Sequence, residues 1–297
     1  MRSEARMWRK VVVVLALVLA SLAVPKEASA DGVSESSGAF LQAIAVRVPA
    51  FRGLEPRLVL GYSSQGGSGF AGVGWGLGGF GVVERFSPGL GSPRFDSSDV
   101  YTLDGRELLP CPAANPSPSC TTGGTHTTKV ESYLRILFQA NTWTVWSRDG
   151  TRTIYSPVYS TPSGTSRWGQ TSTIDTHNNT VSYTWTCPAD DDCYPNTVQF
   201  GPYSVQVSRE ARPDVMSFAT GHASTLRRMR SRLSSIAVRY SGALVREYRL
   251  AYTTSGLTSR SLLHSVQEYG SDGTSLPPYV FQYQSDPAGQ TFQRWGE

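Results

Sequence analysis

Hydrophobic and polar residues alternate along most of this chain from residue 40 onward, which is the pattern of β-strands with one buried face. Phe40–Val48 shows the pattern first, with Ile44, Val46 and Val48 on one side of the predicted strand. No stretch beyond residue 30 keeps an apolar period of 3.6 residues over three turns. The pattern therefore predicts an all-β protein whose successive antiparallel hairpins form a sandwich- or shell-like sheet assembly.

Turn residues separate the predicted strands. Asp149-Gly150 lies between Trp143–Arg148 and Thr151–Tyr155, and an aspartate–glycine pair between β-rich runs is a strong hairpin signal. Pro110–Thr128 is rich in proline, serine and threonine and is expected to be a loop, not a central strand. The other predicted strands are Tyr133–Phe138, Ile174–Tyr183, Tyr203–Ser208, Arg232–Tyr240, Leu244–Tyr252, Leu262–Tyr269 and Tyr279–Tyr283.

The first thirty residues have the pattern of an export signal. Basic residues precede the apolar stretch Val11–Val24, and Ala28-Ser29-Ala30 is a typical cleavage site, which predicts a signal peptide over residues 1–30. The apolar stretch is shorter than the ~20 residues that a membrane-spanning helix needs. We expect a secreted, periplasmic or cell-surface protein without a stable membrane span after cleavage.

The remaining chain divides by composition. Residues 31–39 are polar and are expected to be a flexible lead-in, 40–284 a β domain, and 285–297 a linker or the start of a further module. The net charge of +4 falls to +1 once the signal is removed, because that segment holds five basic and two acidic residues. This small charge predicts no nucleic-acid partner.

Four cysteines occur as two close pairs, Cys111 with Cys120 and Cys187 with Cys193. An even number of cysteines in an exported protein predicts disulfides, and the short spacing favours two local bridges. The two other connectivities remain open. A zinc site is the alternative, although neither pair has C-x-x-C spacing.

The glycine-rich run Gly66–Phe80 is the stretch around which the chain is organised. Gly67, Gly69 and Gly72 match the G-x-G-x-x-G pattern of dinucleotide-binding loops, which requires a helix directly after the loop. Four more glycines follow by residue 79, and each of them disfavours a helix. No cofactor is therefore expected.

The same run has a structural interpretation. Glycine permits positive φ angles and lets two backbones approach closely. Trp75, Leu77 and Phe80 are then expected to fill a core from an irregular crossing between strands.

The sequence lacks the familiar catalytic motifs. The histidines at 126, 177, 222 and 264 are far apart, and no G-x-S-x-G, H-E-x-x-H or Walker pattern is present, so no enzyme activity is predicted. Asp190-Asp191-Asp192 could bind calcium, but a solvated acidic loop is favoured. Glu210 and Asp214 could act as a glycosidase pair, but ion pairs with Arg209 and Arg212 are favoured.

Two further patterns have binding and structural interpretations. Arg227–Arg232 could bind nucleic acid, but the run contains no aromatic residue, which favours a solvated strand edge. The tryptophans could form a carbohydrate-binding face, but cross-strand pairs and core positions are more usual for such residues. The tryptophans in question are Trp143, Trp146, Trp168 and Trp185.

A family resemblance rests on the order and spacing of short motifs. They are Pro56–Ser64 (PRLVLGYSS), Gly72–Leu77 (GVGWGL), Val83–Arg85 (VER) and Asp99–Leu108 (DVYTLDGREL). This region resembles the N-terminal region shared by the SpvB virulence protein and the TcB components of insecticidal toxin complexes, which are related to Rhs/YD-repeat toxins. Similar stretches continue to Tyr283 and include Arg148–Gly150, Asp175–Tyr183, Arg209–Asp214 and Thr258–Leu263. The family tends to place glycine before asparagine where His177-Asn178-Asn179 stands, a turn that asparagine also tolerates.

The resemblance implies a non-catalytic module that helps to build a toxin-enclosing β shell. Its partners would be downstream β-propeller or YD-repeat modules and a toxin-carrying component. The ADP-ribosylating activity of SpvB lies in a separate domain, which nothing here resembles. The alternative is a secreted adhesin or carbohydrate-binding β module. Phe292 and Trp295 would belong to the next element, and the structural site residues would be Trp75, Gly72, Gly74, Asp104, Gly105, Asp149 and Gly150.

Overall fold

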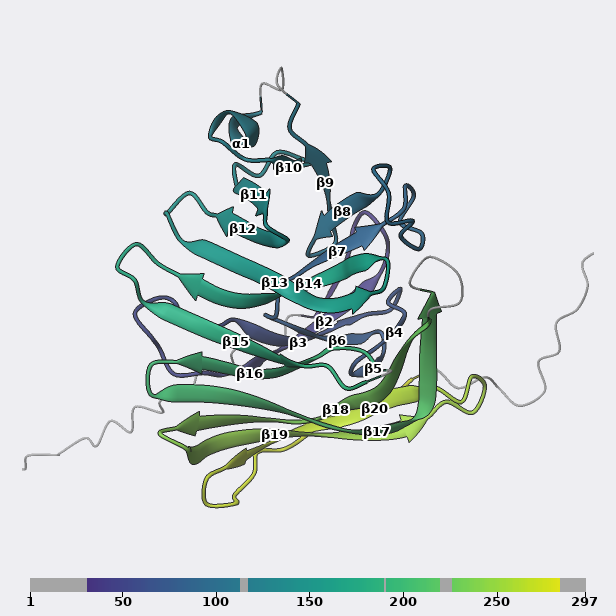
Figure 1. Ribbon diagram of the computed structural model, residues 1–297. Helices are drawn as coiled ribbons and strands as arrows, with labels where there is room; N and C mark the ends of the chain where they lie inside the picture. Colours follow the sequence, from purple (N-terminus) through teal and green to yellow (C-terminus); the bar gives the residue numbers. More distant parts are fainter. Residues whose placement is uncertain (1–30, 113–116, 190, 220–225, 284–297) are drawn as a thin grey trace, which may run out of the picture.

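The computed structural model describes residues 31–112, 117–189, 191–219 and 226–283, and these residues form an almost entirely β fold (Figure 1). The elements are β1 (Gly32–Val33), β2 (Phe40–Val46), β3 (Leu58–Ser63), β4 (Ser68–Gly69), β5 (Gly72–Val73), β6 (Trp75–Gly78), β7 (Val82–Phe86), β8 (Val100–Leu103), β9 (Arg106–Pro110), α1 (Pro118–Thr121), β10 (His126–Thr128), β11 (Arg135–Gln139), β12 (Thr142–Trp146), β13 (Arg152–Thr161), β14 (Gly164–Ile174), β15 (Thr180–Thr186), β16 (Tyr194–Phe200), β17 (Tyr203–Ala219), β18 (Leu226–Tyr240), β19 (Ala243–Thr254), β20 (Ser261–Gly270) and β21 (Tyr279–Val280). The all-β prediction is confirmed.

Strands β7 to β14 close into an eight-stranded barrel. Each strand pairs with its neighbour in the sequence, and β14 closes the ring by pairing with both β13 and β7. The barrel interior is packed with apolar side chains, among them the fully buried Trp143 and Trp168. The same hydrogen-bonded sheet then continues from β14 through β15 to β21.

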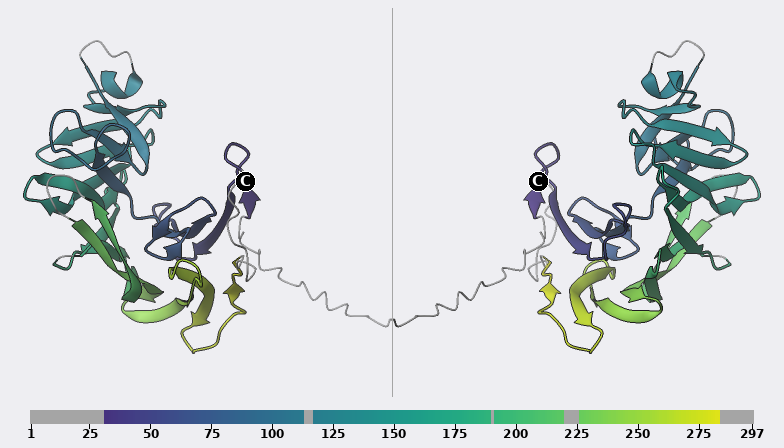
Figure 2. Two further views of the ribbon diagram at one scale, coloured as in Figure 1. Left: turned by 90° about the vertical axis from the view of Figure 1, so that its right-hand side faces the viewer. Right: turned by 90° about the vertical axis from the view of Figure 1, so that its left-hand side faces the viewer.

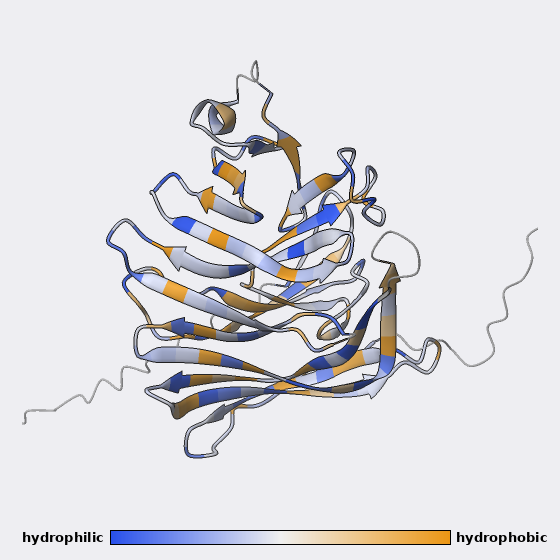
Figure 3. Ribbon diagram, viewed as in Figure 1, coloured by the Kyte–Doolittle hydropathy of each residue, from blue (hydrophilic) through white to orange (hydrophobic). Residues whose placement is uncertain are grey.

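A second, smaller sheet packs against this continuation. It has the strand order β1-β2-β3-β6, and Figure 2 shows it (purple) facing the inside of the curve formed by the green and yellow strands of the long sheet. Inward side chains of both sheets make one core, which includes Ile44, Leu60, Val205, Ile236 and Leu263. Figure 3 shows the hydrophobic and hydrophilic residues alternating along the long strands, as a sheet with one covered face requires.

Two segments expected to be irregular contain strands. In the predicted lead-in 31–39, Ser34 accepts a hydrogen bond from the Gly38 amide and donates its own amide to Ala39, which folds the chain back so that β1 pairs with β2. In the predicted loop Pro110–Thr128, β10 forms part of the barrel wall and pairs with both β9 and β11. The prolines of that segment all precede β10, so its three residues are free to pair.

The prediction of a solvated strand edge at Arg227–Arg232 is wrong in part. This run pairs along β17, and the side chains of Arg227 and Arg232 are only 17% and 16% exposed. Both guanidinium groups contact acidic partners that are distant in the sequence.

His126 of β10 lies among aromatic rings of the barrel. Its ring centroid is 4.8 Å from that of Trp143 and 5.8 Å from that of Tyr101, and its Nδ1 shares a 2.9 Å hydrogen bond with the Thr125 hydroxyl. Burial lowers the pKa of His126 to about 4.

This burial predicts a specific loss of stability in acid. In the unfolded chain His126 has its ordinary pKa of about 6.5. Between about pH 6.5 and pH 4 the unfolded chain therefore binds more protons at His126 than the folded chain does. The free energy of unfolding therefore falls as pH falls through that window, and His126→Phe should reduce the fall. The midpoints of urea unfolding of the wild type and of His126→Phe, at about pH 7.5 and about pH 4.5, measure this loss of stability. An equal loss in the two proteins would contradict the role assigned to His126.

Candidate functional site

The glycine-rich run crosses from the small sheet to the long sheet. At Gly72, where φ is +98°, an added Cβ would lie 2.8 Å from the carbonyl oxygen of Ser261 in β20. At Gly74, where φ is +75°, it would lie 2.5 Å from a ring carbon of Tyr62. The run therefore needs glycine both for its backbone angles and for its close approach to neighbouring strands.

Hydrogen bonding also ties the crossing to the long sheet. The Leu233 amide in β18 donates to the carbonyl of Phe70, 2.9 Å away. The run forms the short hairpin β4–β5 and then β6, which pairs with β3. A strand and not a helix follows Gly72, so the structure lacks the helix terminus that a dinucleotide loop requires.

Trp75 is the large side chain that the crossing delivers into the core. It is 3% exposed, and its ring centroid lies 5.2 Å from that of Tyr62 and 4.6 Å from that of Phe281. Its indole Nε1 donates to the Tyr283 hydroxyl at 2.9 Å, and that hydroxyl donates to the Leu263 carbonyl at 2.8 Å. The polar end of Trp75 is thus satisfied inside the core.

A buried ion pair stands beside the crossing. Arg212 is 4% exposed; its guanidinium donates to the Gly69 carbonyl at 3.2 Å and to Asp214 at 3.0 Å. Asp214 also accepts hydrogen bonds from the amide and the hydroxyl of Ser261, at 2.8 and 2.6 Å. The pair sits at a register shift of β17, between Ala211 and Met216, and joins that irregularity to both the crossing and β20.

The pKa of Asp214 follows from these contacts. Burial raises the pKa of Asp214, but the hydrogen bonds from Arg212 and Ser261 lower it by a larger amount. The pKa of Asp214 is therefore well below its usual range. An ionised carboxylate with all these partners cannot serve as a general acid. Glu210, the other member of the considered glycosidase pair, binds Arg232 at 2.7 Å and not Arg209, whose guanidinium lies over the Tyr194 ring.

A second charged cluster joins the barrel to the long sheet. Arg167 of β14 pairs with Glu84 of β7 at 2.7 Å and with Asp192 at 2.8 Å. Arg227 of β18 approaches the same two carboxylates, at 3.8 and 3.5 Å. Four separate segments of the chain therefore meet at four charged side chains.

This cluster corrects the expected solvated loop at residues 190–192. Asp191 and Asp192 are 8% and 1% exposed. Asp191 accepts hydrogen bonds from the Tyr194 hydroxyl at 2.6 Å and from the Arg230 amide at 3.0 Å. Asp190 lies outside the described residues. Within the part of the chain that the structure describes, no cluster of three or more metal-ligating side chains is found.

The predicted aspartate–glycine residues form turns of two barrel hairpins. Asp104 and Gly105 have φ angles of +49° and +78°, and the Asp104 carboxylate accepts a 2.8 Å hydrogen bond from the Val82 amide. In the second turn, Gly150 has a φ of +82°, and Asp149 accepts a 2.9 Å hydrogen bond from the Thr151 amide. The structure brings Gly72, Gly74 and Trp75 together but leaves these turn residues in separate hairpins.

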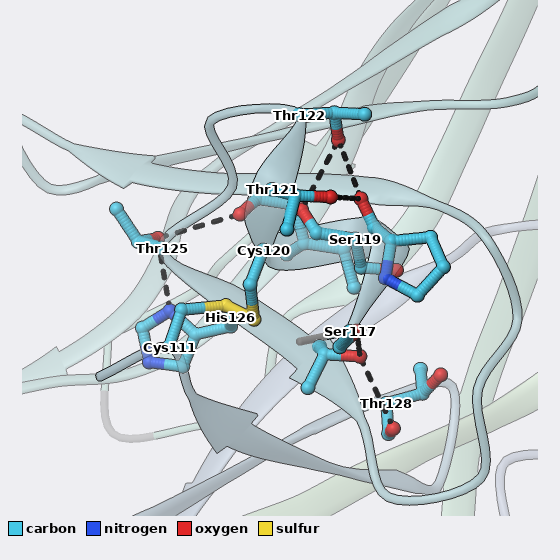
Figure 4. Close-up of a disulfide and its surroundings, with 12 residues drawn as sticks. Cys111, Ser117, Ser119, Cys120, Thr121, Thr122, Thr125, His126 and Thr128 are labelled. Carbon is cyan, nitrogen blue, oxygen red and sulfur yellow. Dashed lines mark hydrogen bonds between the residues drawn. A yellow bond between two sulfur atoms is a disulfide. The ribbon is translucent and has the colours of Figure 1, made fainter. Parts of the chain in front are cut away.

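The four cysteines form two local disulfides, Cys111–Cys120 and Cys187–Cys193. Figure 4 shows the first, which links the end of β9 to α1 close to His126. Glu131 anchors the same region by accepting hydrogen bonds from the hydroxyls of Ser117 and Ser119, which lower the pKa of Glu131 to about 2.

The tryptophans do not form a common exposed face. Trp143 and Trp168 are 0% and 1% exposed inside the barrel, and the indole of Trp185 donates to the Gln170 carbonyl. The Arg135 guanidinium lies over the ring of Trp146, 4.5 Å from the ring centroid.

No helix in the described ranges has the length and apolar character to span a bilayer.

An aromatic groove was not predicted from the sequence. It has a volume of about 270 Å³ and opens beside Trp75, at the end of the core between the two sheets. The residues that line it are Phe40, Gln42, Tyr62, Trp75, Val280, Phe281, Gln282 and Tyr283. They come from four distant segments, so only the strand alternation in β2 and β3 could have indicated their shared face.

Comparison with known proteins connects the chain to one family. The model of the family described as Salmonella virulence plasmid 65kDa B protein matches residues 34–279. No curated protein sequence matches the chain. Its structure is similar to that of the N-terminal domain of effector protein SpvB from Salmonella typhimurium strain LT2, with a TM-score of 0.62 and 18% identity over 76% of this chain and 98% of that one.

Two Tc toxin structures share the fold as well. The crystal structure of TcdB2-TccC3 gives a TM-score of 0.68 at 16% identity and covers 86% of this chain. The Photorhabdus luminescens Tc holotoxin pore gives 0.67 at 17% identity, again over 86%. The chain spans only 17% and 16% of the lengths of those two chains.

The crossing predicts different outcomes for two nearby glycines. Gly72→Ala should destabilise the protein by at least the ~1–3 kcal/mol of a strained positive φ angle, because its Cβ also meets the Ser261 carbonyl. Gly76→Ala is the matched control: its Cβ meets nothing within 4 Å, so its effect should stay within about 0.5 kcal/mol. Equilibrium denaturation of the wild type, Gly72→Ala and Gly76→Ala measures their free energies of unfolding. Similar stabilities for the two variants would contradict the close approach of Gly72 to Ser261.

Proposed function

Because this chain belongs to the family of the Salmonella virulence plasmid 65kDa B protein, we propose that it is a non-catalytic structural module of a secreted toxin complex or virulence protein. In this proposal residues 1–30 are a signal peptide, and the β domain of residues 40–284 helps to build a shell around a toxic segment. The partners would be downstream β-propeller or YD-repeat modules and a toxin-carrying component.

One observation carries the proposal. The fold of this chain matches nearly the whole SpvB N-terminal domain, 98% of it, and also a small part, 17%, of the TcdB2-TccC3 chain. A fold that occurs both as a separate domain and as one piece of a much longer chain behaves as a building block. At these identities the likeness concerns the fold, so the assembly role remains our inference.

The charged side chains support a structural role. Arg212 pairs with Asp214 within β17 and also donates to the distant Gly69 carbonyl, and Arg167 pairs with Glu84 and Asp192 of two other segments. These ion pairs connect neighbouring strands and segments to one another. The shape supports the same role, because the long sheet continues the barrel wall and curves around the small sheet (Figure 2).

The proposal predicts a stable complex with a neighbouring gene product. The chain is co-expressed with the polypeptide encoded immediately downstream, and the purified material is weighed by native mass spectrometry. We expect a complex of defined stoichiometry, and no binding of the isolated chain to a glycan array. Dose-dependent glycan binding without complex formation would instead support the adhesin or carbohydrate-binding alternative.

A further inference from the structure

One short loop joins the barrel to the long hairpin of β17 and β18. The loop runs from β15 to β16, is closed by the Cys187–Cys193 disulfide and contains the buried Asp192. One carboxylate oxygen of Asp192 pairs with Arg167 of the barrel strand β14 at 2.8 Å. The other oxygen lies 3.5 Å from Nε of Arg227 in β18. The disulfide therefore ends one residue away from a carboxylate that the barrel and the hairpin share.

The same loop supports the hairpin at an irregular point. The pairing of β17 with β18 changes register between Ala211 and Met216 of β17. Opposite this shift, the Arg230 amide of β18 donates to the Asp191 carboxylate at 3.0 Å and to the Tyr194 hydroxyl at 2.9 Å. The loop and the start of β16 thus supply acceptors for a backbone donor where the strand pairing is interrupted.

Beyond the register shift the hairpin forms an arm, made of residues 216–219 of β17 and 226–229 of β18. These residues pair again, and Figure 1 shows the arm rising out of the long sheet beside the barrel (green, at the right). The hydroxyl of Ser92, between the barrel strands β7 and β8, donates to the Ala219 carbonyl at 3.1 Å. The arm therefore lies against the barrel.

The arm is held at the charged cluster less tightly than the barrel is. Arg167 contacts Glu84 and Asp192 at 2.7 and 2.8 Å, whereas Arg227 of the arm lies 3.8 and 3.5 Å from the same two residues. Among the described residues, the buried Nε of Arg227 has no hydrogen-bond acceptor. Because ionic attraction falls with distance, a shift of the loop would weaken the Arg227 contact before the Arg167 contact.

The two sulfur atoms of the disulfide differ in their access to solvent. Cys187 is exposed, whereas Cys193 is only 4% exposed. One thiolate of a dithiol can attack the Cys187 sulfur and form a mixed disulfide with it, which releases Cys193 as a thiolate. The second thiolate of the dithiol then displaces Cys187. The dithiol is oxidised to its disulfide, and both cysteines are reduced.

We propose that the Cys187–Cys193 disulfide is a redox-controlled clamp on the arm. In an oxidising medium the closed loop fixes Asp191 and Asp192 and keeps the arm against the barrel. Reduction by a dithiol removes the covalent constraint on the loop, so the supports of Arg230 and Arg227 loosen together and the arm opens. This inference does not depend on the proposed assembly role, because it concerns how two parts of this chain are joined.

Amide hydrogen exchange of the full chain tests the clamp. The Cys111→Ser/Cys120→Ser variant keeps only the second disulfide. Exchange is measured before and after treatment of the folded protein with dithiothreitol, and alkylation with mass spectrometry counts the thiols. We expect the Arg230 amide and the arm to exchange at least about tenfold faster after reduction, while β19 and β20 keep their rates. Reoxidation should restore slow exchange.

A second comparison leaves the first disulfide intact. Cys187→Ser/Cys193→Ser without reductant should show the same faster exchange relative to the wild type. With both disulfides closed, Arg227→Gln should speed exchange in the arm and leave the Arg230 amide protected. Arg228→Gln, at the exposed neighbouring position, should change neither.

Four results would each overturn the proposal. The disulfide could resist dithiothreitol in the folded protein, or the arm could exchange at the same rate after its reduction. All strands could accelerate equally, which would mean a general loss of stability and no clamp. Arg227→Gln could also leave exchange in the arm unchanged, which would show that the charged cluster does not hold it.

Discussion

The packing of the two sheets depends on a backbone contact that only glycine permits. Gly72 passes so close to the Ser261 carbonyl that any side chain there would collide with β20. This approach brings Ala71 and Trp75 into the core between the sheets. Dispersion contacts weaken quickly when surfaces separate, so even a small displacement of the crossing would cost contacts along the whole interface. The glycine-rich run is therefore the structural centre of the molecule, although it holds no ligand-binding motif of the kind its spacing resembles.

Two charged clusters fix how the other parts meet around this centre. Arg212 and Asp214 tie the irregular part of β17 to the crossing, and Arg167 joins the barrel to Asp192 beside the long sheet. Buried ion pairs add little net stability, but losing one partner leaves an uncompensated charge, at a cost of ~3–5 kcal/mol. Their directional bonds select one arrangement of the segments.

Local patterns in the sequence predicted much of the fold, but they did not predict which residues distant in the sequence contact each other. Alternation and the Asp149-Gly150 turn located most hairpins, because both signals depend on neighbouring residues. The closure of the barrel and strand β10 were not predicted, since pairing depends on strands that are distant in the chain. Arg212 and Asp214, two positions apart, were expected as a pair, but Ser261 was not. Asp191 and Asp192 were misjudged as solvated because their partners, the Arg230 amide and the Arg167 guanidinium, lie in distant strands. The aromatic groove was missed for the same reason.

The central claim is that both sheets and the crossing form one preformed, cooperative building block. Amide hydrogen exchange of the wild type and of Trp75→Ala tests this most directly, because exchange reports which segments open together. The account predicts that β2, β3 and β6 share one opening free energy with β17 to β20 in the wild type. It also predicts that Trp75→Ala lowers this free energy in both sheets and leaves the barrel protected. If the small sheet exchanges quickly by itself while the long sheet stays protected in both proteins, the two sheets are independent and the claim is wrong.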